Sequence, residues 1–306
     1  MRIAALLPSA TEMVCALGVR ADLVARSHEC DFPPGVEELP VLTSARIGPL
    51  PSSRAIDSAV RDALRDALSI YQIDLPRLRE ARPEVIVTQD LCEVCAVSLD
   101  DVRSAVARLA SQDVRIVTLH PTRLADIWAD IGRIADAIGR SSSATELVRG
   151  LRERVDAVGR RASRVSSRPR VLTIEWIDPI MIGGMWMPEL VTVAGGEPLV
   201  TQPGDHAVTL QREQLAALDP EVVLVKPCGF DLPRTLAELP ALRAAVPSSW
   251  RARLYAADGN AYFNRPGPRI VESLEILAAC IHPDAFQDFA RKHATGFCRL
   301  EPHGDR

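Results

Sequence analysis

Two stretches decide the fold: residues 78–87 read Leu-Arg-Glu-Ala-Arg-Pro-Glu-Val-Ile-Val, and residues 215–224 read Leu-Ala-Ala-Leu-Asp-Pro-Glu-Val-Val-Leu. In each, a helix-forming segment stops before a proline, which cannot continue a helix, and a buried apolar run follows. A cysteine-containing loop comes next, because Cys92 lies nine residues after Pro83 and Cys228 lies eight residues after Pro220. The shared order of elements indicates that the second half of the chain repeats the first.

Outward from these stretches, short runs rich in Val and Ile alternate with segments of helical period. Near-continuous apolar strands between helices are typical of parallel sheets that are covered on both faces. The sequence therefore predicts an α/β fold. The predicted strands are Ile3–Leu7, Leu23–Arg26, Val85–Thr88, Val114–Leu119, Val171–Trp176, Val222–Val225 and Leu254–Ala257.

A single long helix is expected to join the two halves. Its apolar residues recur at Leu147, Leu151, Val155 and Val158, and it follows a break at residues 139–143. The predicted domains are an N-terminal α/β lobe (1–140), a connecting helix and linker (141–168) and a C-terminal α/β lobe (169–306). Two lobes joined in this way form a clamp with the ligand cleft between them.

Other helices are predicted from their starts. Ser9, Ser98 and Ser143 are each followed three residues later by Glu or Asp, which is the pattern of a capping box at a helix start. Residues 52–72 have apolar spacing of helical period and predict an additional helix on the first lobe, ending near Tyr71.

Composition excludes several classes of protein. The chain has 306 residues, of which 47% are hydrophobic and 25% are charged, with a net charge of −4. The chain has no excess of basic residues to bind nucleic acid, and only 4% of its residues are aromatic, too few to stack on single-stranded nucleic acid. No run approaches the ~18 apolar residues of a membrane span. The first strand starts at Ile3 with no signal peptide visible, so we expect a cytoplasmic protein.

The candidate ligand-binding residues lie in loops after predicted strands, because ligands of open α/β sheets bind beyond the carboxyl ends of the strands. Trp176 could form part of an apolar wall for a large flat ligand, or it could be core, and the same alternatives hold for Trp186. The candidate residues are His28, Glu29, Gln89, Asp90, Trp176, His206, Phe230, Tyr262 and Arg265.

The thiols of these loops suggest a metal site. His28, Cys30, Cys92 and Cys95 supply the ligand types of a Cys3His zinc site, and Cys228 lies on a corresponding loop of the second half. Two alternatives stay open at this point. The cysteines could be buried, idle thiols, or Cys92 and Cys95 could form a redox pair ahead of a helix start.

Motifs of common enzymes are absent. The chain has no Gly-x-Ser-x-Gly, Walker loop, Gly-x-Gly-x-x-Gly or His-Glu-x-x-His sequence. His120, at a predicted strand end, is expected to be structural, and His282, His293 and His303 are expected to be solvated. These observations favour a binding protein over an enzyme.

Several segments resemble a known family. Residues 2–12, 82–87, 193–196, 215–225 and 263–269 are similar to the cobalamin-type periplasmic binding proteins of ABC importers, and the resemblance covers residues 2–282. Residues 27–33, 89–95 and 227–230 together resemble a branch assigned to cobalamin binding. The resemblance implies two Rossmann-like lobes bridged by a rigid helix, and a ligand such as cobalamin, haem, a siderophore or a metal ion.

The resemblance also implies a partner, an ABC importer that docks on an acidic residue of each lobe. Arg103 stands near the first of those positions, with Asp100 and Asp101 beside it. Two functions are therefore expected. The first is a substrate-binding protein that holds a corrinoid or another metal-containing small ligand in the cleft. The second is a protein or metalloenzyme that binds zinc or an iron–sulfur centre through His28 and the cysteines.

Overall fold

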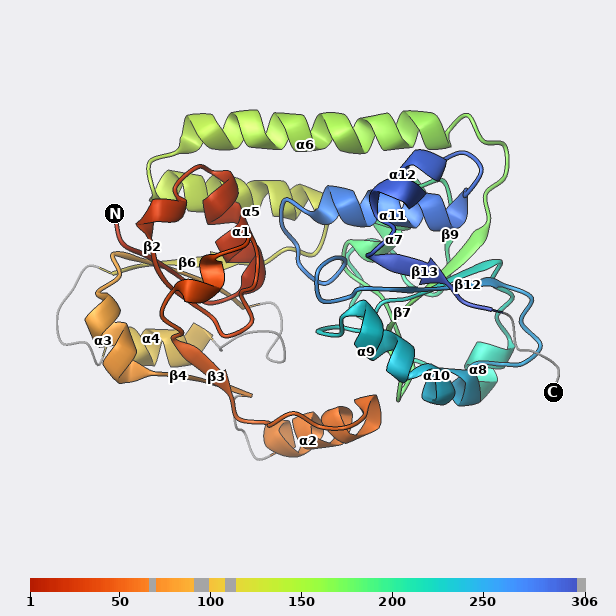
Figure 1. Cartoon of the computed structure of the whole chain (residues 1–306), viewed down its shortest axis with the longest axis horizontal. Helices are drawn as coiled ribbons and strands as arrows, with labels where there is room; N and C mark the ends of the chain where they lie inside the picture. The colour runs from red at the N-terminus through yellow and green to blue at the C-terminus, as the bar shows by residue number, and fades with distance from the viewer. Residues whose placement is uncertain (66–69, 91–98, 108–113, 302–306) are drawn as a thin grey trace. The chain divides into compact units, whose positions relative to one another are not determined.

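A computed structural model describes residues 1–65, 70–90, 99–107 and 114–301 (Figure 1). The chain forms two compact units, each built around its own sheet. The first unit comprises residues 1–51, 58–121 and 125–150, and the second comprises residues 52–57, 122–124 and 151–306.

The first unit contains a parallel sheet with the strand order β2-β1-β5-β6. Its strands are β1 (Ile3–Ala5), β2 (Leu23–Arg26), β5 (Val85–Gln89) and β6 (Arg115–Leu119). Helices α3 (Leu75–Ala81) and α4 (Leu99–Ala107) pack on one face, where Leu78 and Val102 join Ile86 in a buried cluster. Helices α1 (Pro8–Ala16) and α5 (Leu124–Ala137) lie on the other face (Figure 1). Both faces are thus covered, as the apolar strands predict.

The second unit contains a mixed sheet. Its parallel centre is β7 (Arg170–Trp176), β11 (Val222–Val225) and β12 (Arg253–Ala257). The short strand β9 (Glu197–Pro198) is parallel to β7, whereas β8 (Met181–Ile182), β10 (Val208–Thr209) and β13 (Phe297–Arg299) pair antiparallel with their neighbours.

Helices cover both faces of this second sheet too (Figure 1). The first set is α8 (Arg212–Ala216), α9 (Leu232–Ala237) and α10 (Leu239–Ala245), and the second is α7 (Met187–Val193) and α11 (Ile270–Ile281). The short α12 (Gln287–Lys292) packs against α11. The remaining short elements are β3 (Thr43–Ala45), β4 (Tyr71–Ile73) and the 3-10 turns Arg20–Asp22 and Val36–Glu38.

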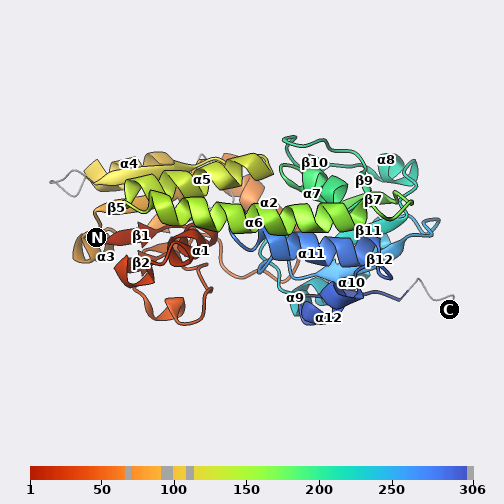
Figure 2. The ribbon, with the colours of Figure 1, turned by 90° about the horizontal axis from the view of Figure 1, so that it is seen from above.

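The long connecting helix is α6 (Ser141–Ala162), and its second half lies along α11 (Figure 2). Arg154 joins the two helices, since its Nη2 donates to Glu272 at 3.0 Å and to Glu275 at 2.8 Å. Lys292 and His293 also contact Glu275, so the expectation that His293 is solvated is wrong. Burial alone would raise the pKa of Glu275, but hydrogen bonds from His293, Lys292 and Arg154 lower it to about 2.

All seven predicted strands are confirmed in position, and three helix predictions need correction. α1 begins at Pro8, a favoured first helical residue, so Ser9 lies inside the helix with its buried Oγ unpartnered in the described chain. α6 begins two residues before Ser143. The helix expected over residues 52–72 is α2 (Ser53–Arg65), and Tyr71 instead pairs with Ala45 in the β3–β4 ladder.

The start of α2 counts with the second unit rather than with the first lobe as predicted. Ser53 is fully buried, and its Oγ donates to Oε2 of Glu238 at 2.8 Å. Arg54 donates to Asp178 at 2.7 Å. A carboxylate at the amino end of a helix is favourable because the helix dipole is positive there. Among the described residues, none of the helices has the length and apolar character of a membrane span.

Candidate functional site

The candidate site of the first unit is the carboxyl edge of its parallel sheet. Because all four strands run in the same direction, the loops that follow them leave from one edge. These loops begin with Ser27 after β2, Asp90 after β5 and His120 after β6. The sequence predicted these loops as ligand-binding from the strand ends, and that role stays a prediction.

His28 and Glu29 form one group at this edge. Nδ1 of His28 lies 2.7 Å from the hydroxyl of Thr43, and its ring lies 5.2 Å from the ring of Tyr71. The hydroxyl of Tyr71 donates to Glu29 at 2.8 Å. Burial first, and the nearby charge of Arg26 second, lower the pKa of His28, which favours a neutral ring.

The thiols of the expected metal site do not form a group in the described part of the chain. Cys30 is 1% exposed, and its Sγ accepts a hydrogen bond from Thr11 at 3.0 Å, which is the setting of a core thiol. Cys228 is exposed on a loop of the second unit, and Cys92 and Cys95 lie outside the described residues. No group of three or more His, Cys, Asp or Glu side chains that could hold a metal ion occurs among the described residues.

Gln89 ends β5, and Asp90 follows it. Gln89 is buried, whereas Asp90 reaches out and places Oδ1 at 2.7 Å from Nδ1 of His120. The backbone of His120 also forms a hydrogen bond to the carboxylate of Asp130. Burial raises the pKa of Asp130 to about 6 against the opposing charge of Arg133. The sequence placed Asp90 and His120 at strand ends but did not pair them.

An aromatic pair marks the carboxyl edge of the second sheet. Trp176 ends β7, and its ring lies 5.3 Å from the ring of Phe230, at an angle of 56°. Nε1 of Trp176 is buried and has no hydrogen-bond partner in the described chain. Trp186, by contrast, donates to the carbonyl of Phe263 at 2.9 Å and belongs to the core.

Lys226 is a buried cation at this edge that the sequence analysis did not single out. It directly follows β11 and is 0% exposed, and its Nζ lies 3.0 Å from Oε2 of Glu175 and 3.1 Å from Oδ1 of Asn264. Asn264 in turn donates to the carbonyl of Gly259 at 2.9 Å. The network holds a buried positive charge at the edge where Trp176 lies, because β7 and β11 are paired in register.

The remaining candidate residues of the second unit differ in their exposure to solvent. Arg265 is 6% exposed and donates to Asn260 at 2.9 Å. Tyr262 is half-buried under the guanidinium of Arg269, which lies 5.7 Å from the ring centre, and burial raises the pKa of Tyr262. His206 is exposed on the loop before β10. Only the exposed atoms of these three side chains are available for contact with a ligand.

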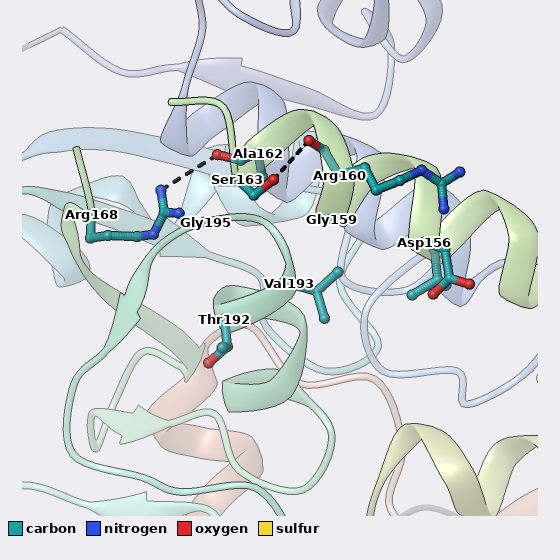
Figure 3. A pocket seen from close by; sticks show the side chains of 10 residues that line it. Asp156, Gly159, Arg160, Ala162, Ser163, Arg168, Thr192, Val193 and Gly195 are labelled. Carbon is teal, nitrogen blue, oxygen red and sulfur yellow. Dashed lines mark hydrogen bonds between the residues drawn. The ribbon is translucent and has the colours of Figure 1, made fainter. Parts of the chain in front are cut away.

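A cavity of about 440 Å³ lies between α6 and α7 (Figure 3), away from the candidate edge. Its wall includes Gly159, Ser163, Arg168 and Val193. Arg168 precedes β7, so the cavity lies at the amino end of that strand. Arg168 donates to the carbonyl of Val165 at 2.7 Å, and Ser163 donates to the carbonyl of Arg160 at 2.9 Å, so both bind main chain.

Known proteins share the sequence pattern and the fold of this chain. The family model described as "Periplasmic binding protein" matches residues 3–244. A vitamin B12-binding protein of Photorhabdus laumondii subsp. laumondii is 22% identical over 281 residues, which cover 90% of this chain and 86% of that protein.

Solved structures show the same fold. A periplasmic heme-binding protein from Pseudomonas aeruginosa superposes with a TM-score of 0.69 at 19% identity, covering 98% of this chain and 95% of the other. The periplasmic vitamin B12-binding protein BtuF of Vibrio cholerae gives a TM-score of 0.65 at 18% identity, covering 92% and 96%. The family resemblance seen in the sequence is therefore confirmed, and the chain belongs to the periplasmic binding protein family.

Proposed function

We propose that this substrate-binding protein holds a metal–macrocycle, a corrinoid of the cobalamin type or the related tetrapyrrole haem. Two kinds of relative support the proposal, since one is named for vitamin B12 and another for heme. Corrinoids and haem share a flat ring, a metal at its centre and polar groups at its rim. The proposed ligand contacts the loops at the carboxyl edge of the second sheet.

The observation that carries the proposal is the pair of Trp176 and Phe230. Trp176 is partly exposed at the sheet edge and is backed by the buried ring of Phe230, so its indole offers apolar area to a flat ligand. Nε1 of Trp176 is buried without a partner in the described chain, so a carboxylate or amide on the ligand rim would satisfy this donor once the indole turns to expose it. A buried polar group that lacks a partner is costly, so a ligand that supplies an acceptor gains affinity.

Titration with aquocobalamin and with haemin tests the proposal. The visible spectrum of at least one ligand should change on addition of the protein, with quenching of tryptophan fluorescence at the same concentrations. Trp176→Phe should weaken binding about tenfold, because it removes a hydrogen bond of about 1.5 kcal/mol and keeps most of the ring.

Trp250→Phe is the matched control. Nε1 of Trp250 donates to the carbonyl of Leu218 at 3.0 Å, and its partly buried ring packs against the core cluster that contains Leu242 of α10. It should lower stability and leave ligand affinity unchanged. If the wild-type protein binds neither aquocobalamin nor haemin, the proposal is wrong.

The second candidate is a zinc or iron–sulfur protein that uses His28, Cys30, Cys92, Cys95 and Cys228. Elemental analysis of freshly isolated protein distinguishes it from the first. A stoichiometric metal that disappears in Cys92→Ser would favour a metal centre, and metal-free protein would exclude it.

A third element of the proposal is the partner. Proteins of this family work with ABC importers. The exposed Asp100 on α4 offers a carboxylate for such docking, although Arg103 lies 3.7 Å from it. If a permease co-purifies with the wild-type protein and not with Asp100→Lys, the importer is supported. If no permease co-purifies with the wild-type protein, this part of the proposal is contradicted.

A further inference from the structure

We propose that Glu175 determines specificity, so that the protein binds a macrocycle with amides at its rim in preference to one with carboxylates. The inference rests on the proposed function and uses residues of the second unit alone. Glu175 and Trp176 end β7, and their Cα atoms are about 3.8 Å apart. Successive side chains of a strand point to opposite faces, so the two groups flank the end of β7. A macrocycle that lies across this end and stacks on Trp176 also brings its rim to Glu175.

A buried cation holds the carboxylate of Glu175. Its Oε2 lies 3.0 Å from Nζ of the fully buried Lys226, whereas 23% of the Glu175 side chain is exposed. Its other oxygen, Oε1, forms no hydrogen bond with any residue that the structure describes. An ammonium at this depth requires an ionised partner, because a buried charge without one is costly. The pair therefore presents an acceptor oxygen to a ligand and keeps its cation out of reach.

The surrounding contacts fix this ion pair in place. Asn264 accepts a hydrogen bond from Nζ of Lys226 at 3.1 Å, and its Nδ2 donates to the carbonyl of the same lysine at 3.1 Å. Phe263, the residue before it, is fully buried with a φ of 51°, a strained conformation that persists only where the surroundings impose it. A Cβ at Gly183 would lie 3.3 Å from Oε2 of Glu175, so the chain also packs closely on that side. The carboxylate thus has a set direction before any ligand arrives.

The two macrocycles of the proposed function differ in the chemistry of their rims. Corrinoids of the cobalamin type carry amides, which both donate and accept hydrogen bonds. Haem carries propionates, which are ionised and only accept. An amide N–H can donate to Oε1 of Glu175, and a hydrogen bond to a charged acceptor is a strong one. A propionate at the same place brings like charges together, which is a common way for a binding site to reject a competitor.

The cations at this edge do not compensate for the carboxylate. In the loops that follow β7, β11 and β12, the cations are Lys226, Arg265 and Arg269. Lys226 is buried in its ion pair, and Arg265 is 6% exposed. Arg269 is the competing group for a carboxylate rim, but its guanidinium lies over the ring of Tyr262, 5.7 Å from the ring centre. The charged group beside the stacking residue is Glu175, which favours an amide rim.

Two corrinoids with the same ring and metal test the inference. Dicyanocobinamide has amides at its rim, and dicyanocobyrinic acid has carboxylates at the same positions. Cyanide occupies both axial positions of the cobalt in each, so the difference in affinity reports the rim. In titrations followed by tryptophan fluorescence, the wild-type protein should bind dicyanocobinamide at least about tenfold more tightly. Higher ionic strength should reduce this ratio, because salt screens exposed charges.

The double variant Glu175→Gln/Lys226→Met tests the residue itself. It removes both charges of the pair and leaves neither without a partner, so the ratio should fall to within about threefold as dicyanocobyrinic acid binds more tightly. Glu175→Gln alone keeps the ammonium and should shift the ratio further toward dicyanocobyrinic acid. Asp62→Asn is its matched control, because it makes the same change in net charge at an exposed ion pair of the first unit and should leave the ratio unchanged.

The outcomes separate this inference from the proposed function. If the wild-type protein binds neither aquocobalamin nor haemin, both are overturned. If it binds either of these but binds dicyanocobyrinic acid at least as tightly as dicyanocobinamide, only the inference is overturned. This comparison needs no substitution, so it decides the preference even if a variant fails to fold.

Two further results would overturn the role of Glu175. One is a ratio that persists in the folded double variant or that Asp62→Asn changes as much as Glu175→Gln does. The other is a preference for dicyanocobyrinic acid that disappears in Arg269→Gln, which would assign the selection to Arg269.

Discussion

Nζ of Lys226 lies 3.0 Å from Oε2 of Glu175 at the carboxyl edge of the second sheet, and the lysine is fully buried while the glutamate is 23% exposed. The two partners of this ion pair therefore depend on it to different extents. Glu175 can recover hydration if the pair is broken, whereas the ammonium of Lys226 cannot. Removing the buried charge and removing its partner therefore change the free energy of unfolding by different amounts.

Glu175→Gln should accordingly cost more stability than Lys226→Met. The first leaves a buried ammonium with a weaker partner and should lower the free energy of unfolding by about 3 kcal/mol. The second removes the buried charge and keeps a similar volume, so about 1 kcal/mol is expected. Urea unfolding measures both. The exposed pair Arg65–Asp62 is the control, since Arg65→Ala should cost less than about 0.5 kcal/mol. The reverse order would show that the lysine is hydrated.

Gly183→Ala should destabilise the same network. A Cβ at position 183 would lie 2.7 Å from Oγ1 of Thr173 and 3.4 Å from Nζ of Lys226. A loss of about 1 to 3 kcal/mol is expected from overpacking. Gly150→Ala is the matched substitution, because a Cβ there meets nothing within 4 Å and lies in α6. It should stabilise the protein by up to about 1 kcal/mol. Equal effects of the two in thermal unfolding would refute the crowding argument.

The carboxyl of Asp130 should make stability depend on pH. Its pKa is raised to about 6 by burial, so its contribution to folding is fully present below its ordinary pKa and is lost as the pH rises through 6. The free energy of unfolding of Asp130→Asn, relative to that of the wild type, should therefore rise by up to about 3 kcal/mol between pH 4 and pH 8. Each pKa unit is worth about 1.4 kcal/mol. Unfolding of both proteins at the two pH values measures this. A pH-independent difference would mean that Arg133 keeps the group ionised throughout.

Glu275 should show the opposite dependence. Its pKa is lowered to about 2, so its contribution is present above its ordinary pKa and disappears as the pH falls through 2. Glu275→Gln should lower the free energy of unfolding by about 3 kcal/mol at pH 7 and by much less at pH 2. Asp62→Asn, at an exposed ion pair, should change little at either pH. A constant deficit of Glu275→Gln across this range would indicate lost packing instead of lost charge pairing.

The sequence was sufficient for the strands and the connecting helix because buried runs and helical period are local signals. It failed at Tyr71, where pairing with Ala45 overrides a helical pattern that runs up to it. It also could not show that Lys226 is buried, because Glu175 lies 51 residues away and meets it only through the register of β7 and β11.

The candidate site was partly predictable for the same reason. Strand ends gave the positions of Asp90 and His120, but their contact depends on β5 and β6 being neighbours in register. Trp176 was chosen from its place after a strand, and the structure adds Phe230 as its partner. The metal cluster predicted from cysteine spacing stays a prediction, since Cys92 and Cys95 lie outside the described residues.

The assignment of residues 52–57 and 122–124 to the second unit has a practical consequence for dissecting this molecule. The chain passes from one unit to the other at residues 51–52, 57–58, 121–122, 124–125 and 150–151. No single cut in the gene yields either unit complete: a fragment that ends at Gly150 carries Ser53 without Glu238, and the complementary fragment has the reverse defect. Half-length fragments would thus be incompletely folded, and each unit has to be studied by point substitution in the intact chain.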